Sequence, residues 1–185
     1  MAISRAQIVD NAAEILREQG LAGLSMRRVA QRLGVQAGAL YHHIASKQDL
    51  LAAVGEQILS AEAATISTTN AALAAADLRQ VLLRIRDGAE VISFVHAYRP
   101  GSLPALETLR RAVRSGQDGS EQSTTERELL GEALICFVLG FVAVEQNRAE
   151  LLRAKILPEG DPTEDPAQSF HYGVSALLAG PRTCA

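Results

Sequence analysis

Residues 24–47 constrain the fold most, because they carry the start and stop signals of two short helices joined by a tight turn. Ser25 stands where an N-cap belongs, since its hydroxyl can accept from the unpaired amides of a first helical turn. Gly34 stands at a C′ position, where glycine takes the left-handed conformation most easily. The apolar face between these two signals consists of Val29, Ala30 and Leu33. With a second helix expected over about 36–43, the layout is that of a helix-turn-helix, whose second helix enters the DNA major groove.

A further amphipathic helix is predicted before this pair. Ser4 and Gln7 are spaced as a capping box at its start, and Gly20 ends it. Its apolar stripe consists of Ile8, Ala12, Ile15 and Leu16. Two short helices cannot bury their own apolar faces, so we expect the first helix to pack across them. The prediction is a three-helix DNA-binding domain over residues 1–46.

Residues 47–185 are predicted to form a larger helical domain, which makes the fold class all-α. The chain has no sustained alternation of the kind that a strand needs, and it is rich in the helix formers Ala and Leu. Asp77 and Gln80 are spaced as a cap pair, so one helix is expected to begin at Asp77. The helices expected here cover about 46–64, 77–85, 103–113, 126–156 and 167–179.

Charge divides unevenly along the chain. Residues 1–47 carry six basic and three acidic groups, a net of +3, whereas the whole chain carries −3. The remaining residues are therefore acidic, with a net of −6. A basic first domain on an acidic second one suits a protein that presents only its first domain to a polyanion.

The two cysteines, Cys136 and Cys184, do not make a disulfide framework, which favours a reduced and cytoplasmic location. The longest apolar run, 133–144, is twelve residues and too short to span a bilayer. Residues 3–19 have the pattern of an amphipathic helix rather than of a signal peptide. We therefore expect no membrane partner.

Several short motifs in the first domain occur together at close spacing. They are Gly23-Leu24-Ser25, Arg27-Arg28-Val29-Ala30, Leu33-Gly34-Val35, Leu40-Tyr41-His42-His43 and Ser46-Lys47. In these positions the sequence resembles the N-terminal DNA-binding domain of the TetR family of transcriptional repressors. The resemblance implies that Tyr41 and Lys47 contact phosphate and that His43 faces DNA. The alternative for Tyr41 is a ring that is partly buried in the core.

The start of the second motif helix is expected to meet the bases. Gln36 can offer its amide to adenine, and the neighbouring alanine methyls can touch the methyl of thymine. The predicted DNA-binding residues are Ser25, Arg27, Arg28, Gln36, Ala37, Gly38, Ala39, Tyr41, His43 and Lys47.

Sparser motifs continue through the second domain. They are Leu82-Leu83-Arg84, Arg86-Asp87-Gly88-Ala89, Arg99-Pro100 and Gln168-Ser169-Phe170, followed by Gly173 and Leu177. They resemble the C-terminal domain of the tetracycline-repressor type. That resemblance implies a body with a small-molecule pocket, whose last two long helices form a four-helix bundle with a second copy. The residues expected at this homodimer interface are Leu134, Val138, Leu139, Phe170, Val174 and Leu177.

The run 133–144 supports such a bundle, because it is apolar on every side of the expected helix. A helix that packs on one core through a single face needs only one apolar side. The alternative is a helix buried within a monomer.

The ligand pocket is expected among apolar residues of the second domain, with His96 and Arg99 as polar anchors. The predicted ligand-binding residues are Leu82, Ile85, Ile92, His96, Arg99, Leu106, Phe137 and Phe141. In the tetracycline-binding relatives, a histidine shortly before the Arg-Pro pair ligates magnesium. His96 does not fall at that spacing, and residue 63, which is a drug-contacting histidine in those relatives, is Ala63. We therefore expect a mostly apolar ligand with no metal and no cofactor.

These observations favour a ligand-responsive repressor that binds palindromic operator DNA as a homodimer and is released by a small apolar inducer. A transcriptional activator or a ligand-independent regulator with the same DNA-binding domain is the alternative. A small-molecule enzyme is the weakest reading, because the sequence shows no nucleophile–base–orienter set, no metal cluster and no phosphate-binding glycine loop.

Overall fold

The computed structural model describes residues 3–116, 123–158 and 165–180, and within these ranges it consists of helices and connecting turns without strands. The all-α prediction is therefore confirmed. The α-helices are α1 (Arg5–Gly23), α2 (Met26–Leu33), α3 (Ala37–Leu40), α4 (Lys47–Glu62), α5 (Ala71–Leu83), α6 (Gly88–Tyr98), α7 (Pro104–Arg114), α8 (Thr124–Arg153) and α9 (Pro166–Leu178). A 3-10 turn, Ala63–Thr65, follows α4.

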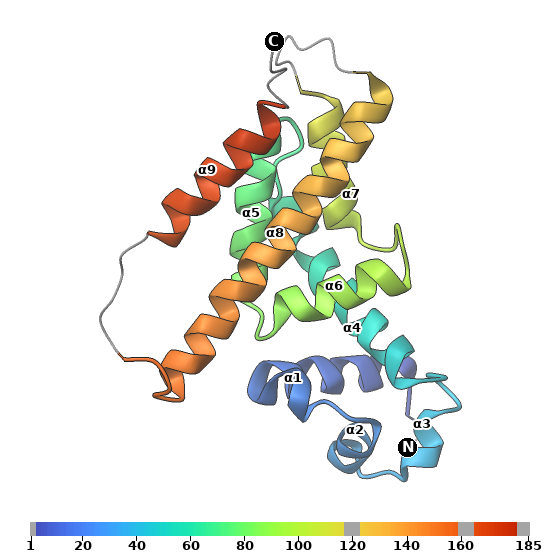
Figure 1. Ribbon diagram of the computed structural model, residues 1–185. Helices are drawn as coiled ribbons and strands as arrows, with labels where there is room; N and C mark the ends of the chain where they lie inside the picture. Colours follow the sequence, from blue (N-terminus) through green and yellow to red (C-terminus); the bar gives the residue numbers. More distant parts are fainter. Residues whose placement is uncertain (1–2, 117–122, 159–164, 181–185) are drawn as a thin grey trace.

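Helices α1, α2 and α3 form the head, which lies at one end of the molecule (Figure 1). Ser4 and Gln7 make the predicted capping box at the start of α1. The Ser25 hydroxyl accepts from the Arg28 amide at 3.2 Å, and Gly34 ends α2 with φ of +69°. Gly20 leaves the helical conformation with φ of +71°, so the last three residues of α1 lie beyond a kink.

The core of the head is completed by α4, which begins at its cap residue Ser46 and continues into the body. Leu50 and Val54 of α4 are fully buried, together with the head residues Ile8, Ala12, Leu16, Val29 and Leu40. Burying a side chain the size of leucine contributes about 1.5–3 kcal/mol. The head therefore depends on α4 for its stability, which the sequence pattern of the first three helices does not predict.

The body, from α4 to α9, is built around the long helix α8 (Figure 1). Helices α5, α6 and α7 pack on one side of α8, and α9 packs against both α8 and α5. The residues buried along the inner side of α8 are Gly131, Leu134, Ile135, Val138, Leu139 and Val142. Helix α6 lies between α8 and α4, and so occupies the junction of body and head.

The predicted start of a helix at Asp77 is wrong. Helix α5 begins at Ala71, and Asn70 caps it by accepting from the Leu73 amide at 2.9 Å. Asp77 lies inside the helix, where its carboxylate accepts from the Ser67 amide at 2.9 Å. The alanines before Asp77 have the highest helix propensity, so the helix extends upstream through them.

Gln146 of α8 adds hydrogen bonds to the backbone of the corner between α5 and α6, where turn bonds already join Ile85 to Leu82 and Gly88 to Ile85. The Gln146 Nε2 donates to the carbonyl oxygens of Leu82 and Ile85 at 3.0 and 2.7 Å. Its Oε1 accepts from the Ala89 amide at 3.1 Å. Two acceptors and one donor on the backbone fix which way the side-chain amide points. One side chain of α8 thus satisfies both ends of the corner.

The same corner holds the head. Asp87 takes a left-handed conformation with φ of 53°, and its Oδ2 accepts from the Leu21 amide at 2.6 Å. Arg86 donates to the Glu18 carbonyl at 2.9 Å. A Cβ added to Gly20 would lie 2.5 Å from the Asp87 carboxylate, so glycine allows this close approach. The body therefore docks on the kink of α1.

Replacing Gln146 by leucine is expected to destabilise the protein, because the Ala89 amide then loses its hydrogen-bond partner. Gln146→Leu should lower the free energy of unfolding by about 1–3 kcal/mol, the cost of one such buried group. Urea denaturation measures this. The matched control is Gln31→Leu at an exposed glutamine of α2, expected within about 0.5 kcal/mol of the native protein. Equal stability of the two variants would show that the corner does not depend on Gln146.

Candidate nucleic-acid interface and ligand cavity

The ten residues predicted to bind DNA lie on α2, α3, the turn after α3 and the start of α4, all at the head end of the molecule (Figure 1). The exposed ones are Arg27, Arg28, Gln36, Gly38, Tyr41, His43 and Lys47, and the half-buried ones are Ser25, Ala37 and Ala39. Tyr41 has 52% of its surface exposed, so the alternative of a core ring is wrong.

The first residues of α3 are open to an approaching surface. Gln36 is the N-cap of α3 but makes no capping bond with its side chain, so its amide is not used there. A Cβ added to Gly38 would meet nothing within 4 Å. These two positions suit close approach to base edges.

The start of α4 combines a cation with a helix N-terminus. Ser46 accepts from the Asp49 amide at 3.0 Å, and Lys47 is the exposed first residue of the helix. Within the described chain, Lys47 makes no ion pair. Its ammonium and the neighbouring free amides of the first turn can therefore receive a phosphate.

The arginines of α2 have different roles. Arg32 bridges to Glu14 and Glu18 of α1 at 2.7 Å each, and its hydrogen bond lowers the pKa of Glu18. Arg28 donates to the Gly23 carbonyl at 3.1 Å. The ion pairs of Arg32 thus join α2 to α1, whereas Arg27 and Arg28 lie at the exposed surface.

Six of the eight predicted ligand-binding residues belong to the apolar interior. Leu82, Ile92 and Leu106 are at most 1% exposed, and Ile85 is 9% exposed. Phe137 and Phe141 are half-buried and pack on Phe170, with ring centroids 5.6 and 5.3 Å away.

The two predicted polar anchors have partners within the protein. His96 Nε2 lies 2.6 Å from a Glu132 oxygen, and Arg110 donates to the other oxygen at 2.8 Å. Burial opposes the ionisation of Glu132, but the bonds from Arg110 and His96 outweigh it and lower the pKa of that carboxyl. This cluster ties α6 and α7 to α8, so His96 acts as a structural residue here.

Arg99 joins the far end of α6 to α4. Its Nη2 donates to Asp49 at 2.6 Å and its Nη1 to Glu56 at 3.3 Å. Hydrogen bonds from Ser46 and then Arg99 lower the pKa of Asp49. With the Asp87 contact at its start, α6 is attached to α1 at one end and to α4 at the other. The prediction of Arg99 as a ligand anchor missed this pairing.

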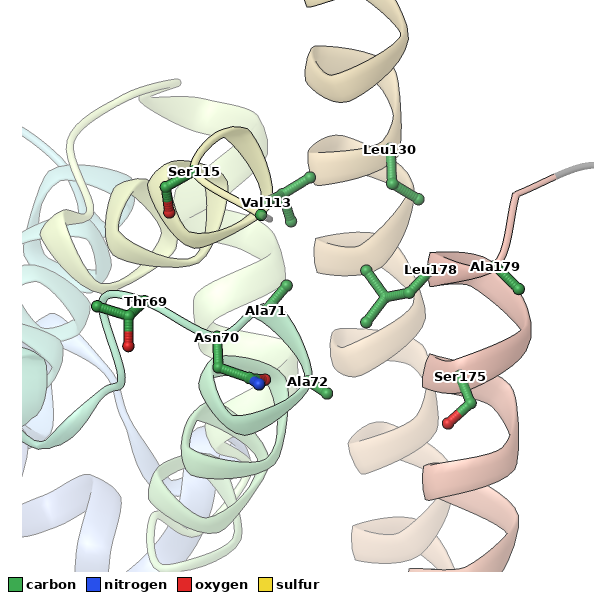
Figure 2. Close-up of a pocket in the computed structure, with 11 residues that line it drawn as sticks. Thr69, Asn70, Ala71, Ala72, Val113, Ser115, Leu130, Ser175, Leu178 and Ala179 are labelled. Carbon is green, nitrogen blue, oxygen red and sulfur yellow. The ribbon is translucent and has the colours of Figure 1, made fainter. Parts of the chain in front are cut away.

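A cavity of about 750 Å³ lies at the opposite end of the body from the head. We call it the distal cavity. Figure 2 shows its walls, with the start of α5 and the end of α7 on one side and α8 and α9 on the other. The lining residues are Thr69, Asn70, Ala71, Ala72, Val113, Ser115, Gly116, Leu130, Ser175, Leu178 and Ala179. None of the eight predicted ligand residues is among them.

The predicted interface residues lie on the inner side of α8 and α9. Leu134, Val138, Leu139, Phe170 and Val174 are at most 4% exposed within the single chain, and Leu177 is half-buried. The first five pack into the core of the single chain and leave no free surface for a second copy, whereas Leu177 remains partly exposed. The exposed residues on the opposite side of α8, which we call the outer stripe, are Leu129, Ala133, Cys136, Gly140 and Val144.

Within the described residues, no group of three or more His, Cys, Asp or Glu side chains could hold a metal ion. No described helix is long and apolar enough to cross a membrane. Cys136 is a free, exposed thiol, and Cys184 lies outside the described residues.

The sequence model of the bacterial regulatory proteins, tetR family, matches residues 8–54, which contain every predicted DNA-binding residue. The tetracycline repressor protein class D of Escherichia coli is 38% identical over 99 residues, 48% of this chain and 44% of that protein. The structure of Mycobacterium smegmatis BioQ is 32% identical, with a TM-score of 0.77 over 96% of this chain and 97% of BioQ. A possible TetR family transcriptional regulator from Streptomyces coelicolor A3(2) is 30% identical, with a TM-score of 0.73 over 96% and 98% of the two chains.

The chain belongs to the TetR family of transcriptional regulators. The similarity to the solved structures extends over nearly the whole of both chains, so it includes the body as well as the head. The chain spans less than half the length of the class D tetracycline repressor that it matches. BioQ has also been solved with its natural double-stranded DNA operator, and that structure is 31% identical with a TM-score of 0.76 over 96% of this TetR-family chain.

The link between Asp49 and Arg99 predicts a dependence of stability on pH. Because the pKa of Asp49 is lowered in the folded protein, its contribution is present above its ordinary value of 3.8 and is lost as pH falls through the lowered value. Asp49→Asn should therefore be less stable than the native protein at neutral pH, and the difference should close in acid. Urea denaturation across this range measures it, and a difference that persists unchanged at the most acidic pH would contradict the assignment.

Proposed function

We propose that this chain is a transcriptional repressor that binds a palindromic operator as a homodimer and is released by a small organic ligand. The observation that carries the proposal is the open surface made by α3, Tyr41 and the start of α4. The match of the tetR family model to this same region and the structure of BioQ with its operator support it.

The head is proposed to place α3 in the major groove, with Gln36 and Gly38 toward the bases. Tyr41 and Lys47 flank α3 and are proposed to contact phosphate, which fixes the orientation of the head without reading sequence. His43, Arg27 and Arg28 add exposed polar groups on the same side. We also propose 1–46 as the DNA-binding domain and 47–185 as the ligand-binding and dimerisation domain, with α4 contributing to both cores.

The homodimer is proposed to form through the outer stripe of α8 and the adjoining face of α9. Leu129 is 66% exposed and Val144 is 68% exposed, while Tyr172 on α9 is 77% exposed. Apolar residues exposed along one face of a pair of helices favour burial against another molecule. Ala133 and Gly140 are small, so two copies of α8 can approach closely there. The two-fold symmetry of such a dimer matches a palindromic operator.

Release by a ligand requires two arrangements of the dimer, only one of which has the head spacing that the operator demands. A molecule that binds the other arrangement better shifts the dimer away from DNA. The class D relative is a tetracycline repressor protein. For this chain we propose a mostly apolar ligand that needs no metal.

A gel-shift experiment tests this function. The protein is mixed with DNA from its own upstream region and with variants in which the spacing of the half-sites is changed by a few base pairs. Binding to one spacing, as a complex with two protein chains, is the expected result. Absence of sequence-dependent binding would refute the repressor, and binding that no compound in an apolar panel weakens would favour the ligand-independent regulator.

Removing the Lys47 ammonium should weaken binding to all DNA sequences alike. Lys47→Ala is expected to lower the slope of log affinity against log salt by about one unit, since one phosphate contact is lost. Tyr41→Phe should weaken binding with a smaller change in slope. Fluorescence anisotropy at several salt concentrations measures both. An unchanged slope and affinity for Lys47→Ala would remove its phosphate role.

A charge on the outer stripe should separate the two copies. Val144→Glu places a carboxylate at an exposed position of α8, so the single chain keeps its core, but an apolar interface would have to bury the charge at a cost of about several kcal/mol. Sedimentation should then report a monomer. Ser93→Glu on the exposed side of α6 is the control and should stay dimeric. A dimeric Val144→Glu variant would place the interface elsewhere.

A further inference from the structure

We propose that Arg99, although it belongs to the body, completes the DNA-binding surface of the head by neutralising the Asp49 carboxylate at the start of α4. Arg99 does not touch DNA in this proposal. It acts through Asp49, and is therefore a positioning residue. The proposal rests on the proposed function, because it takes the first turn of α4 as the place where Lys47 receives a phosphate.

The first turn of α4 carries charges of both signs. Lys47 is the first residue of the helix, and Asp49 follows two residues later. A helix rises 1.5 Å per residue, so their backbones lie about 3 Å apart along its axis. Asp49 Oδ2 accepts from the Ser46 hydroxyl at 2.7 Å, and its amide donates to the same oxygen of Ser46 at 3.0 Å. The carboxylate thus supports the helix cap, but it also places a negative charge in the turn proposed to bind phosphate.

The Asp49 carboxylate is ionised at neutral pH. Hydrogen bonds from Ser46 and then Arg99 outweigh its burial and lower the pKa of this carboxyl. A phosphate bound at the first turn of α4 therefore meets a like charge in that same turn. Charges near a protein surface interact more strongly than in bulk water, and a Debye length of about 10 Å at 0.1 M salt screens such a short separation only in part. Without a cation beside it, Asp49 would repel the phosphate.

Arg99 supplies that cation from the end of α6. Its Nη2 donates to Asp49 Oδ1 at 2.6 Å, and the Tyr98 hydroxyl donates to the same oxygen at 3.3 Å. The guanidinium also lies over the Tyr98 ring, 5.7 Å from its centroid. The side chain of Asp49 is 23% exposed and that of Arg99 is 36% exposed, so the pair lies at the rim of the surface rather than in the core. At this distance the two charges largely cancel for a phosphate at the helix start.

Glu56 of α4 is the other carboxylate that faces Arg99. It accepts from the Arg99 Nη1 at 3.3 Å. Glu56 follows Lys47 by nine residues, so it lies roughly 13 Å further along the helix axis, beyond the Debye length at 0.1 M salt. Glu56 therefore helps to hold the guanidinium, while Asp49 is the carboxylate whose charge matters at the phosphate site.

The alternative is that Arg99 only ties α6 to α4 mechanically. In that case the link is lost whichever partner is replaced, so removing either charge weakens operator binding. Neutralisation predicts opposite signs instead. Removing Arg99 leaves a bare carboxylate beside the phosphate, whereas removing the charge of Asp49 leaves a guanidinium there. Substitutions at the two ends of the pair therefore distinguish the proposal from a mechanical link.

Fluorescence anisotropy with DNA from the protein's own upstream region is the experiment. Arg99→Met keeps a long apolar side chain without the charge, and we expect it to weaken operator binding by about tenfold at 0.1 M salt. Asp49→Asn should bind at least as tightly as the native protein. The double variant restores the local balance of charge and should bind within about threefold of the native protein.

The matched control removes an arginine far from the head. Arg111 is exposed on α7, which lies in the body away from the head (Figure 1). Arg111→Met should bind operator within about twofold of the native protein, since the charge lost is screened over that distance. The defect of Arg99→Met should also shrink as salt is raised, which a mechanical link does not predict. Circular dichroism checks that each variant is folded.

Asp49→Asn decides the proposal even where Arg99→Met fails to fold. Weaker operator binding by Asp49→Asn would overturn neutralisation, and so would a folded Arg99→Met variant that binds like the native protein. A native protein that binds no operator would refute the proposed function instead. Failure of this inference requires a native protein that binds operator, so the two failures are distinguishable.

Discussion

The attachment of the head to the body depends on the corner between α5 and α6. A chain that leaves one helix and enters another inside a protein must find partners for its carbonyl and amide groups there. Turn bonds within the corner use the Leu82 and Ile85 carbonyls, and Gln146 adds a second donor to each and accepts from the Ala89 amide. The corner then presents Asp87 to the Leu21 amide, so hydrogen bonds connect α8 to the head.

Helix α8 has two apolar sides with different tasks. Leu134 and Val138 on the inner side are fully buried in the chain, whereas Val144 on the outer side is exposed. The sequence predicts that the helix is apolar all round, and thus that it has more than one packing surface. It does not say which side faces the chain's own core, since that depends on where α5, α6 and α7 come to lie. Leu134, Val138 and Leu139, which the sequence predicts at an interface, therefore lie on the side of α8 that faces the chain's own core.

Sequence reasoning succeeded where the interaction is local. The caps made by Ser4 and Ser25 join residues three apart, so their spacing in the sequence is enough to predict them. It failed for Asp77 and did not reveal the ion pair of Arg99, because both depend on distant contacts. Asp77 has the spacing of a cap but binds the Ser67 amide from within a helix. Arg99 meets Asp49 only because α6 lies across the start of α4, which no local pattern reveals.

The pairing of charges in the body supports the proposal of a mostly apolar ligand. Arg79 forms a bidentate pair with Glu145 beside the ring of Phe170, and Arg110 pairs with Glu132. Removing one partner from a buried pair such as Arg79–Glu145 costs about 3–5 kcal/mol, so a charged ligand that recruited Arg79 would first have to offset that loss. A mostly apolar molecule can bind in the body without breaking the ion pairs that hold α5 and α7 on α8.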